Sequence, residues 1–316
     1  MTSSGSALEA FEIAGLAAVL IFGSYFLTWR MLMGVRWRRR PTLASDPIPD
    51  HWREIVGRRV PVAGRLTDAE REKLLRLVQV FLREKIIEGC DGLDVTEEMK
   101  VMIAAQACVL LLHLDAGCYP GLRTVLVYPG TYRPRSPTWF KYDLGSTEAR
   151  LGESWRHGVV ILSWDSVASQ AVDSVDGRNV TLHEFAHQLD QQDGVADGTP
   201  ALQSPSAVRH WAAIIARHYD DLVSAAASGR DTVLDYYGAT NKAEFFAVAT
   251  ETFFEQPIQL RQQQPELYDA LREFYRQDPA QRLTVPSTPP DPPDPAGHDV
   301  PVITSPMVRR GPARRA

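Results

Sequence analysis

Apolar residues recur at the spacing of an amphipathic helix in the middle of this 316-residue chain. The positions that follow the i, i+3, i+4, i+7 pattern are Leu182, Phe185, Ala186 and Leu189. This periodicity predicts a helix with one buried face. A second apolar stripe, at Phe245, Ala249 and Phe253, predicts another helix further along the chain. Asn241 precedes this stripe and is a suitable N-cap for the second helix.

Patterning elsewhere predicts a mainly helical α+β fold with a small sheet. Further helices are expected at residues 66–88, 96–114, 165–171, 205–226 and 265–277. Thr67 begins the first of these as an N-cap, and Glu70, three residues later, is its capping-box partner. Strands are expected at 125–128 and 158–164. The continuous apolar run of the second strand fits both an edge strand and a buried central strand.

An uncharged, mostly apolar run follows a short N-terminal tail at residues 1–12. It becomes long enough to span a bilayer if Arg30 reaches the membrane interface. Four arginines follow it between positions 36 and 40, and no Lys or Arg precedes it. The positive-inside rule then places the N-terminus outside and the rest of the chain in the cytoplasm. We therefore predict a single-pass transmembrane anchor at 13–35 and a basic juxtamembrane connector at 36–60. The alternative, a buried core helix, leaves the arginines unexplained.

Composition indicates how the rest of the chain is organised and which classes of function are excluded. A net charge of −5 and a pI near 5.9 argue against general binding of nucleic acid. The cysteines are odd in number and lack CxxC spacing, which indicates reduced thiols rather than a disulfide framework. Residues 283–316 are rich in proline, aspartate and serine, so we expect a disordered tail there. The segment 61–282 is large enough to form one domain with a full core.

The first of the helices described above carries an HExxH motif. Its residues are His183, Glu184, Phe185, Ala186 and His187. Four residues make slightly more than one helical turn, so the two histidines project from one face and both imidazoles can reach one Zn²⁺. Glu184 lies about 100° round the helix, where a carboxylate acts on a water molecule rather than on the metal. The alternative is a chance match on an ordinary amphipathic helix. A catalytic zinc also needs a third protein ligand.

Glu244, at the start of the second helix, is the candidate for that third ligand. Glu244 and Glu251 are seven residues apart and fall on one helix face, so both can point toward the histidines. The position of Glu244 also fits a capping-box partner of Asn241. Glu251 fits an acceptor for a ligand histidine or a solvated carboxylate. Asp190 fits either a carboxylate that orients His187 or one without such a role.

Two segments of the chain resemble a known family. HEFAHQLD at 183–190 and YGATNKAEFFAVATETFFEQP at 237–257 are similar to the Mlc titration factor family of bacterial zinc peptidases, whose catalytic core is similar to that of anthrax lethal factor. The resemblance covers about residues 61–282 and implies a zincin-type fold for this domain. One departure is Val248, where lethal factor has another acid. The contacts of that acid must come from another residue here or be absent.

The resemblance implies a metallopeptidase of the gluzincin type. His183, His187 and Glu244 would bind one Zn²⁺ per chain, and the substrate would be a peptide or protein. Glu184 would be the general base that takes a proton from a zinc-activated water. Tyr237 matches the tyrosine that faces the reacting carbonyl in these enzymes, where it can donate a hydrogen bond to the developing oxyanion.

Two other classes of function stay open. The family is named for binding and sequestering a transcriptional repressor, which would make this protein a regulatory binding partner with weak or partner-activated peptidase activity. A structural zinc protein is the third hypothesis, although a glutamate beside three ligands is hard to reconcile with a closed four-ligand site. Together with the predicted anchor, the resemblance places the catalytic domain on the cytoplasmic side of a bacterial inner membrane.

Overall fold

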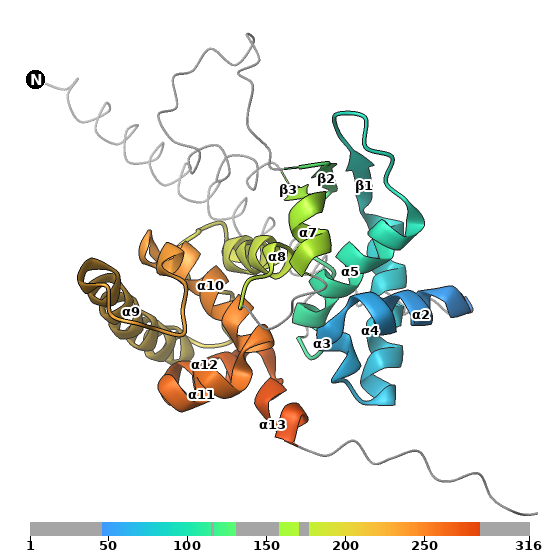
Figure 1. Cartoon of the computed structure of the whole chain (residues 1–316). Coiled ribbons are helices and arrows are strands. Elements are labelled where there is room, and N and C mark those ends of the chain that lie inside the picture. Colours follow the sequence, from blue (N-terminus) through green and yellow to red (C-terminus); the bar gives the residue numbers. More distant parts are fainter. Residues whose placement is uncertain (1–45, 115–116, 131–157, 171–176, 285–316) are drawn as a thin grey trace, which may run out of the picture. The chain divides into compact units, whose positions relative to one another are not determined.

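The structure, a computed structural model, describes residues 46–114, 117–130, 158–170 and 177–284 (Figure 1). The strands are β1 Ile86–Gly89, β2 Thr124–Tyr128 and β3 Val159–Ser163. The helices and 3-10 turns are α2 Asp50–Arg59, α3 Pro61–Gly64, α4 Asp68–Glu84, α5 Glu97–Leu111, α7 Trp164–Gln170, α8 Val180–Asp190, η1 Gln191–Asp193, α9 Pro205–Ser228, η2 Tyr236–Ala239, α10 Lys242–Glu255, α11 Pro257–Gln263, α12 Pro265–Tyr275 and α13 Pro279–Thr284. The predicted α+β class, mainly helical with a small sheet, is confirmed.

The sheet of the described residues has three parallel strands in the order β1-β2-β3. Ile87 pairs with Val125, and Val125 pairs with Val160, so one buried apolar row crosses all three strands. Within the described residues, β3 is an edge strand, which decides between the two positions that its apolar run allowed. The prediction of a helix through residue 88 is wrong, because α4 ends at Glu84 and β1 follows. The partner of β1 lies far along the chain, so the local pattern does not reveal this strand.

The N-terminal end of α4 is fixed by the predicted capping box. The Thr67 side chain accepts a hydrogen bond from the Glu70 backbone N–H, and the Glu70 side chain accepts one from the Thr67 N–H. The same glutamate contacts His113 Nε2 at 2.9 Å, just beyond the end of α5. His113 thus joins two helices and lies in none of the metal-binding positions. α5 packs against α4 and is buried on nearly all sides.

α8 lies between α5 and α10 and packs against both (Figure 1). Its predicted apolar residues Leu182, Phe185, Ala186 and Leu189 are all buried. The Phe185 ring lies 5.7 Å from the ring of Phe81 and 4.8 Å from that of Tyr119, centroid to centroid. Such tilted and edge-on aromatic contacts add about 1 kcal/mol each beyond burial. This packing fixes the rotation of α8 about its axis and turns its histidines toward α10.

The prediction of a single-pass membrane protein is corrected. In the part of the chain that the structure describes, no helix is long and apolar enough to cross a bilayer. A spanning helix needs about 20 apolar residues, whereas the apolar helix α5 has 15 and the 24-residue α9 carries charges along its length. The segment predicted as the anchor, 13–35, lies outside the described residues, as does 285–316 of the predicted tail. Residues 50–59 of the predicted connector form α2.

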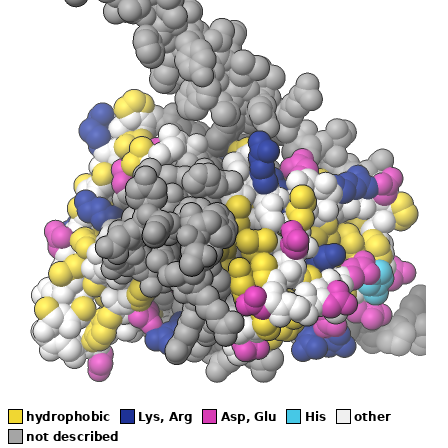
Figure 2. Space-filling model, turned by 90° about the horizontal axis from the view of Figure 1, so that it is seen from above, with side chains coloured by type: hydrophobic (Ala, Val, Ile, Leu, Met, Phe, Trp, Pro, Cys, Tyr) yellow, Lys and Arg dark blue, Asp and Glu magenta, His cyan; other side chains and the backbone are white. Residues whose placement is uncertain are grey.

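Charged side chains are interspersed with apolar ones on the face shown in Figure 2. Several of the surface charges form ion pairs, among them Arg53 with Glu72 and Arg217 with Glu266. Exposed pairs of this kind contribute little to global stability, because water and salt screen them. The fold therefore depends chiefly on its buried core. The cysteines are free thiols, as predicted, and two of them, Cys108 and Cys118, are buried in that core.

Candidate metal centre

Two histidines of α8 form the first part of the centre. The helix begins after Asn179, whose side-chain oxygen accepts a hydrogen bond from the Leu182 N–H at 3.0 Å. One turn further along, His183 and His187 bring their Nε2 atoms to 3.2 Å from each other. The His183 side chain is 13% exposed, and that of His187 is fully buried. The structure thus places both residues of the motif on the same helix face, directed at one point.

Glu244 enters the same point from α10. Its backbone N–H is capped by the Asn241 side chain at 3.0 Å, which fixes the first turn of this helix. Its carboxylate is directed at the histidines, with Oε2 at 2.9 Å from His183 Nε2 and 3.3 Å from His187 Nε2. Glu244 therefore belongs to the N-terminal turn of α10 through its backbone and to the candidate centre through its side chain.

The three nitrogen and oxygen atoms fit a zinc ion. Bonds of about 2.0–2.1 Å in a tetrahedral arrangement require ligand atoms about 3.3 Å apart, and the observed separations are 2.9, 3.2 and 3.3 Å. Two imidazoles and one carboxylate are also a donor set of catalytic zinc sites, which keep a fourth position open. Geometry and chemistry are therefore both consistent with a metal ion held by His183, His187 and Glu244.

The protonation of these groups also indicates a site for a cation. Burial alone would lower the pKa of His183, but hydrogen bonds to Glu244 and Glu251 raise it well above its usual value. Burial would raise the pKa of Glu244, yet hydrogen bonds from His183 and His187 hold it at about 2. Burial lowers the pKa of His187. The two carboxylates thus favour a positive charge between them.

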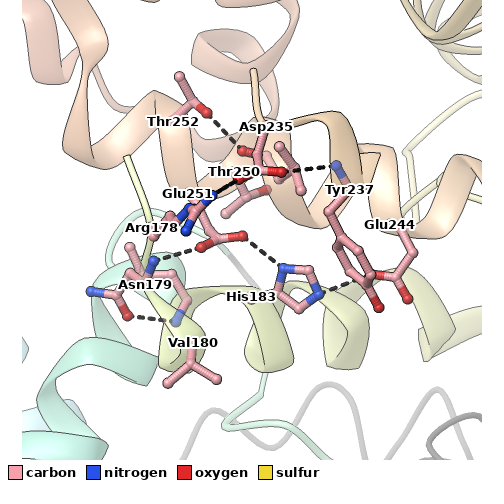
Figure 3. A network of polar contacts seen from close by, with 12 residues as sticks. Arg178, Asn179, Val180, His183, Asp235, Tyr237, Glu244, Thr250, Glu251 and Thr252 are labelled. Carbon is pink, nitrogen blue, oxygen red and sulfur yellow. Dashed lines mark hydrogen bonds and ion pairs between the residues drawn. The ribbon is translucent and has the colours of Figure 1, made fainter. Parts of the chain in front are cut away.

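Glu251 holds the far side of the His183 ring, as Figure 3 shows. Its Oε1 lies 2.7 Å from His183 Nδ1, and its Oε2 accepts a hydrogen bond from the Asn179 backbone N–H at 2.5 Å. A carboxylate can only accept, so Nδ1 carries the proton and Nε2 is left to face the metal position. Of the two roles open to Glu251, the structure shows the acceptor. Val248 stands where lethal factor has an acid, and its side chain can accept no hydrogen bond. Glu251 is the residue of α10 that binds the Nδ1 side of the His183 ring.

Glu184 and Tyr237 lie next to this centre on different elements. Glu184 follows His183 on α8, is 8% exposed, and is close enough to raise the pKa of that histidine by its charge. Tyr237 lies in η2, and its ring centroid is 5.9 Å from that of His183. Tyr237 is 44% exposed, so it reaches from the candidate centre to the surface. The structure thus places both predicted catalytic residues beside His183 of the candidate centre.

Asp190 is fully buried at the end of α8. Its Oδ2 accepts a hydrogen bond from the Gly198 N–H at 3.0 Å, which ties the end of the helix to the following loop. Burial raises the pKa of Asp190 to about 7. A contact that orients His187 stays a prediction.

Sequence reasoning did not identify three residues that support the centre, Arg178, Asn179 and Asp235. Asn179 directly precedes the motif helix, and an Asn at that place is a typical N-cap signal. Asp235 lies two residues before Tyr237, which is the spacing of an Asx-turn. Arg178 carries no local signal, because the carboxylate that its guanidinium binds belongs to Asp235, 57 residues away.

Comparison with known proteins gives the family. The chain matches the family described as glucose-regulated metallo-peptidase M90 over residues 35–276. The chain belongs to this family. A related uncharacterised protein of Synechocystis sp. is 40% identical over 82% of this chain and 95% of the relative. Mlc titration factor A of Pectobacterium atrosepticum is 32% identical over 79% of this chain and 94% of the relative. Mlc titration factor A of Cronobacter sakazakii is 31% identical over 80% of this chain and 95% of the relative.

These matches confirm the resemblance stated from the two sequence segments. They cover most of the chain and are independent of the geometry around α8 and α10. The family is one of metallo-peptidases. The structure brings two histidines and a glutamate close enough together to hold one metal ion. Both findings support the same coarse function, a metallopeptidase.

Proposed function

We propose that this chain is a zinc-dependent metallopeptidase that hydrolyses peptide bonds at the centre between α8 and α10. The observation that carries the proposal is the triangle of His183 Nε2, His187 Nε2 and Glu244 Oε2, with sides of 2.9–3.3 Å. Zinc held by these three atoms would polarise the scissile carbonyl and activate a water molecule. Membership of a metallo-peptidase family makes this chemistry the expected use of such a triangle.

Glu184 moves the protons of the reaction. It follows the ligand His183 on α8, and its burial places a carboxylate where bulk water competes little with the substrate. As the new C–O bond forms, Glu184 accepts a proton from the attacking water. It then gives that proton to the amine nitrogen as the C–N bond breaks, so the carboxylate is regenerated.

Tyr237 stabilises the negative charge that develops on the carbonyl oxygen. Its ring lies beside that of His183, and its exposed side chain leaves the hydroxyl accessible to a substrate. The hydroxyl donates a hydrogen bond to the oxyanion, an interaction worth about 10²- to 10³-fold in rate when it is removed. Tyr237→Phe should therefore lower kcat more than it raises KM.

Cleavage of a mixed peptide library by the full chain, followed by mass spectrometry, tests the proposal. Glu184→Gln keeps the shape of the side chain but removes its basicity, and should lower the rate by about 10²-fold or more at unchanged zinc content. Glu266→Gln, on the exposed side of α12, is the matched control and should cut like the wild type. A zinc-loaded wild type that cuts no peptide, or an active Glu184→Gln variant, would contradict the proposal.

The identity of the metal needs its own measurement. Activity should disappear after chelation and return with one equivalent of zinc per chain. Manganese and cobalt, added separately to the metal-free protein, show whether the same three ligands serve other ions. Recovery of activity by one of these ions but not by zinc would retain the metallopeptidase and refute the zinc assignment.

A second candidate function is the binding of a transcriptional repressor. It is supported by the names of relatives such as that of Pectobacterium atrosepticum, which are called Mlc titration factor A. The Glu184→Gln variant separates the two functions, because it should retain the protein surface while it loses hydrolysis. Sedimentation of that variant with a purified repressor would show a complex if binding is the function, and separate boundaries if it is not.

A further inference from the structure

Two consecutive residues before α8 bind carboxylates from two other elements, as Figure 3 shows. The Asn179 backbone N–H donates to Glu251 on α10. The Arg178 guanidinium donates from Nε at 2.9 Å and from Nη2 at 2.5 Å, both to Asp235 Oδ2. The start of the metal-binding helix is thereby connected to α10 through one carboxylate and to the chain just before η2 through the other.

Asp235 connects Arg178 with Tyr237. While its Oδ2 receives the guanidinium, its Oδ1 accepts the Tyr237 backbone N–H at 2.9 Å. The next residue, Gly238, packs so closely that an added Cβ would lie 3.0 Å from Leu222 Cδ2. One side of the η2 turn is therefore fixed by packing, and the side next to α8 is held by Asp235.

We infer that Arg178 and Asp235 are positioning residues that hold Tyr237 against His183. The inference rests on the proposed function, because it assigns them a purpose through the tyrosine that acts on the substrate. Two guanidinium N–H groups donate to one oxygen of Asp235, which holds this carboxylate while its other oxygen accepts the Tyr237 N–H. The Arg178 side chain is 64% exposed, and exposed ion pairs contribute little to global stability. Its effect should therefore be local, on the placement of the Tyr237 turn.

The structure suggests a set of variants in the full, zinc-loaded chain. Arg178→Ala removes the guanidinium, Arg178→Lys keeps the charge but loses the planar group, and Asp235→Asn keeps the acceptor for the Tyr237 N–H. Arg217→Ala is the matched control, since Arg217 forms an ion pair of similar length and exposure with Glu266. Each variant is compared for kcat, KM and zinc content, alone and combined with Tyr237→Phe.

We expect Arg178→Ala and Asp235→Asn to lower kcat by roughly tenfold with little change in KM, since small displacements at a reacting centre have effects of this size. Arg178→Lys should recover part of the rate. In the Tyr237→Phe background, Arg178→Ala should change kcat by less than about twofold, because residues that act through one another are not additive. Equal factors in both backgrounds would overturn the inference.

Hydrogen–deuterium exchange provides a readout that does not depend on hydrolysis. Arg178→Ala should speed exchange in peptides that cover residues 234–240, while Arg217→Ala should not. If the wild type hydrolyses no peptide, the proposed function fails, and faster exchange still supports the positioning role. Unchanged exchange in this segment would overturn that role whether or not the protein is a peptidase.

Discussion

Glu251→Gln is the change that most directly tests how the centre is held. The Glu251 carboxylate lies between two donors, His183 Nδ1–H at 2.7 Å and the Asn179 N–H at 2.5 Å. Glutamine has the same shape but offers one oxygen and one NH₂ group. In either orientation of the amide, one of the two donors faces the NH₂ group, and the negative charge behind His183 is lost.

The expected cost follows from these contacts. Residues that orient a metal-ligating histidine typically contribute 10- to 100-fold in metal affinity, which is about 1.4–2.7 kcal/mol. The upper part of this range is expected here, because Glu251 is buried and an unpaired buried donor adds about 1–3 kcal/mol. Part of that penalty also applies to the metal-free protein and cancels in the affinity. We therefore expect a loss of about 30- to 100-fold in zinc affinity.

Competition with a chromophoric chelator measures this affinity directly. The wild type, Glu251→Gln and the exposed control Glu266→Gln are titrated at one pH, and unfolding in urea is followed on the same samples. The reasoning is refuted if Glu251→Gln binds zinc within threefold of the wild type while its fold is intact. Weaker binding by the control would show that the assay reports general charge rather than the contact to His183.

Two other carboxylates predict opposite pH dependences of stability. Contacts with Thr67, His113 and Arg282 outweigh burial and hold the pKa of Glu70 at about 2. Glu70→Gln should therefore destabilise the protein by about 1–3 kcal/mol at neutral pH, and the difference should vanish as pH falls from about 4.5 to 2. Burial raises the pKa of Asp190 from 3.8 to about 7, so stability is lost as pH rises from about 4 to about 7. Asp190→Asn should recover up to about 4 kcal/mol above pH 8 in the metal-free protein. Urea unfolding across pH checks both, and a constant offset contradicts either.

That His183, His187 and Glu244 come together could be predicted because their signals are local. His183 and His187 are related by one helical turn, and the apolar residues between them determine which way the helix faces. Glu244 follows its own N-cap by three residues, so its place at the start of a helix is also a local property. In each case a short sequence pattern contains the information that the structure uses.

The supports of the centre depend on contacts between distant parts of the chain. Arg178 meets Asp235 across 57 residues, and Glu251 meets Asn179 across 72. β1 escapes prediction for the same physical reason, because Ile86 becomes a strand only by pairing with residues around Thr124. Periodicity shows which face of a helix or strand is buried. It does not show which charged side chain of another element will contact that helix or strand.

The spacing of the two glutamates on α10 is a local sequence pattern, and their contacts with His183 join distant parts of the chain. Seven residues advance a helix by about 10.5 Å, and the imidazole of His183 lies between the two side chains, with Glu244 at Nε2 and Glu251 at Nδ1. The ring thus bridges two turns of α10, and one histidine belongs both to the candidate metal centre and to the contact between the two helices. A proton on His183 can complete this arrangement in the metal-free protein, since both carboxylates favour the charged ring. Because both contacts lie within the protein, we expect the two glutamates of α10 to hold the His183 ring whether or not a metal ion is bound.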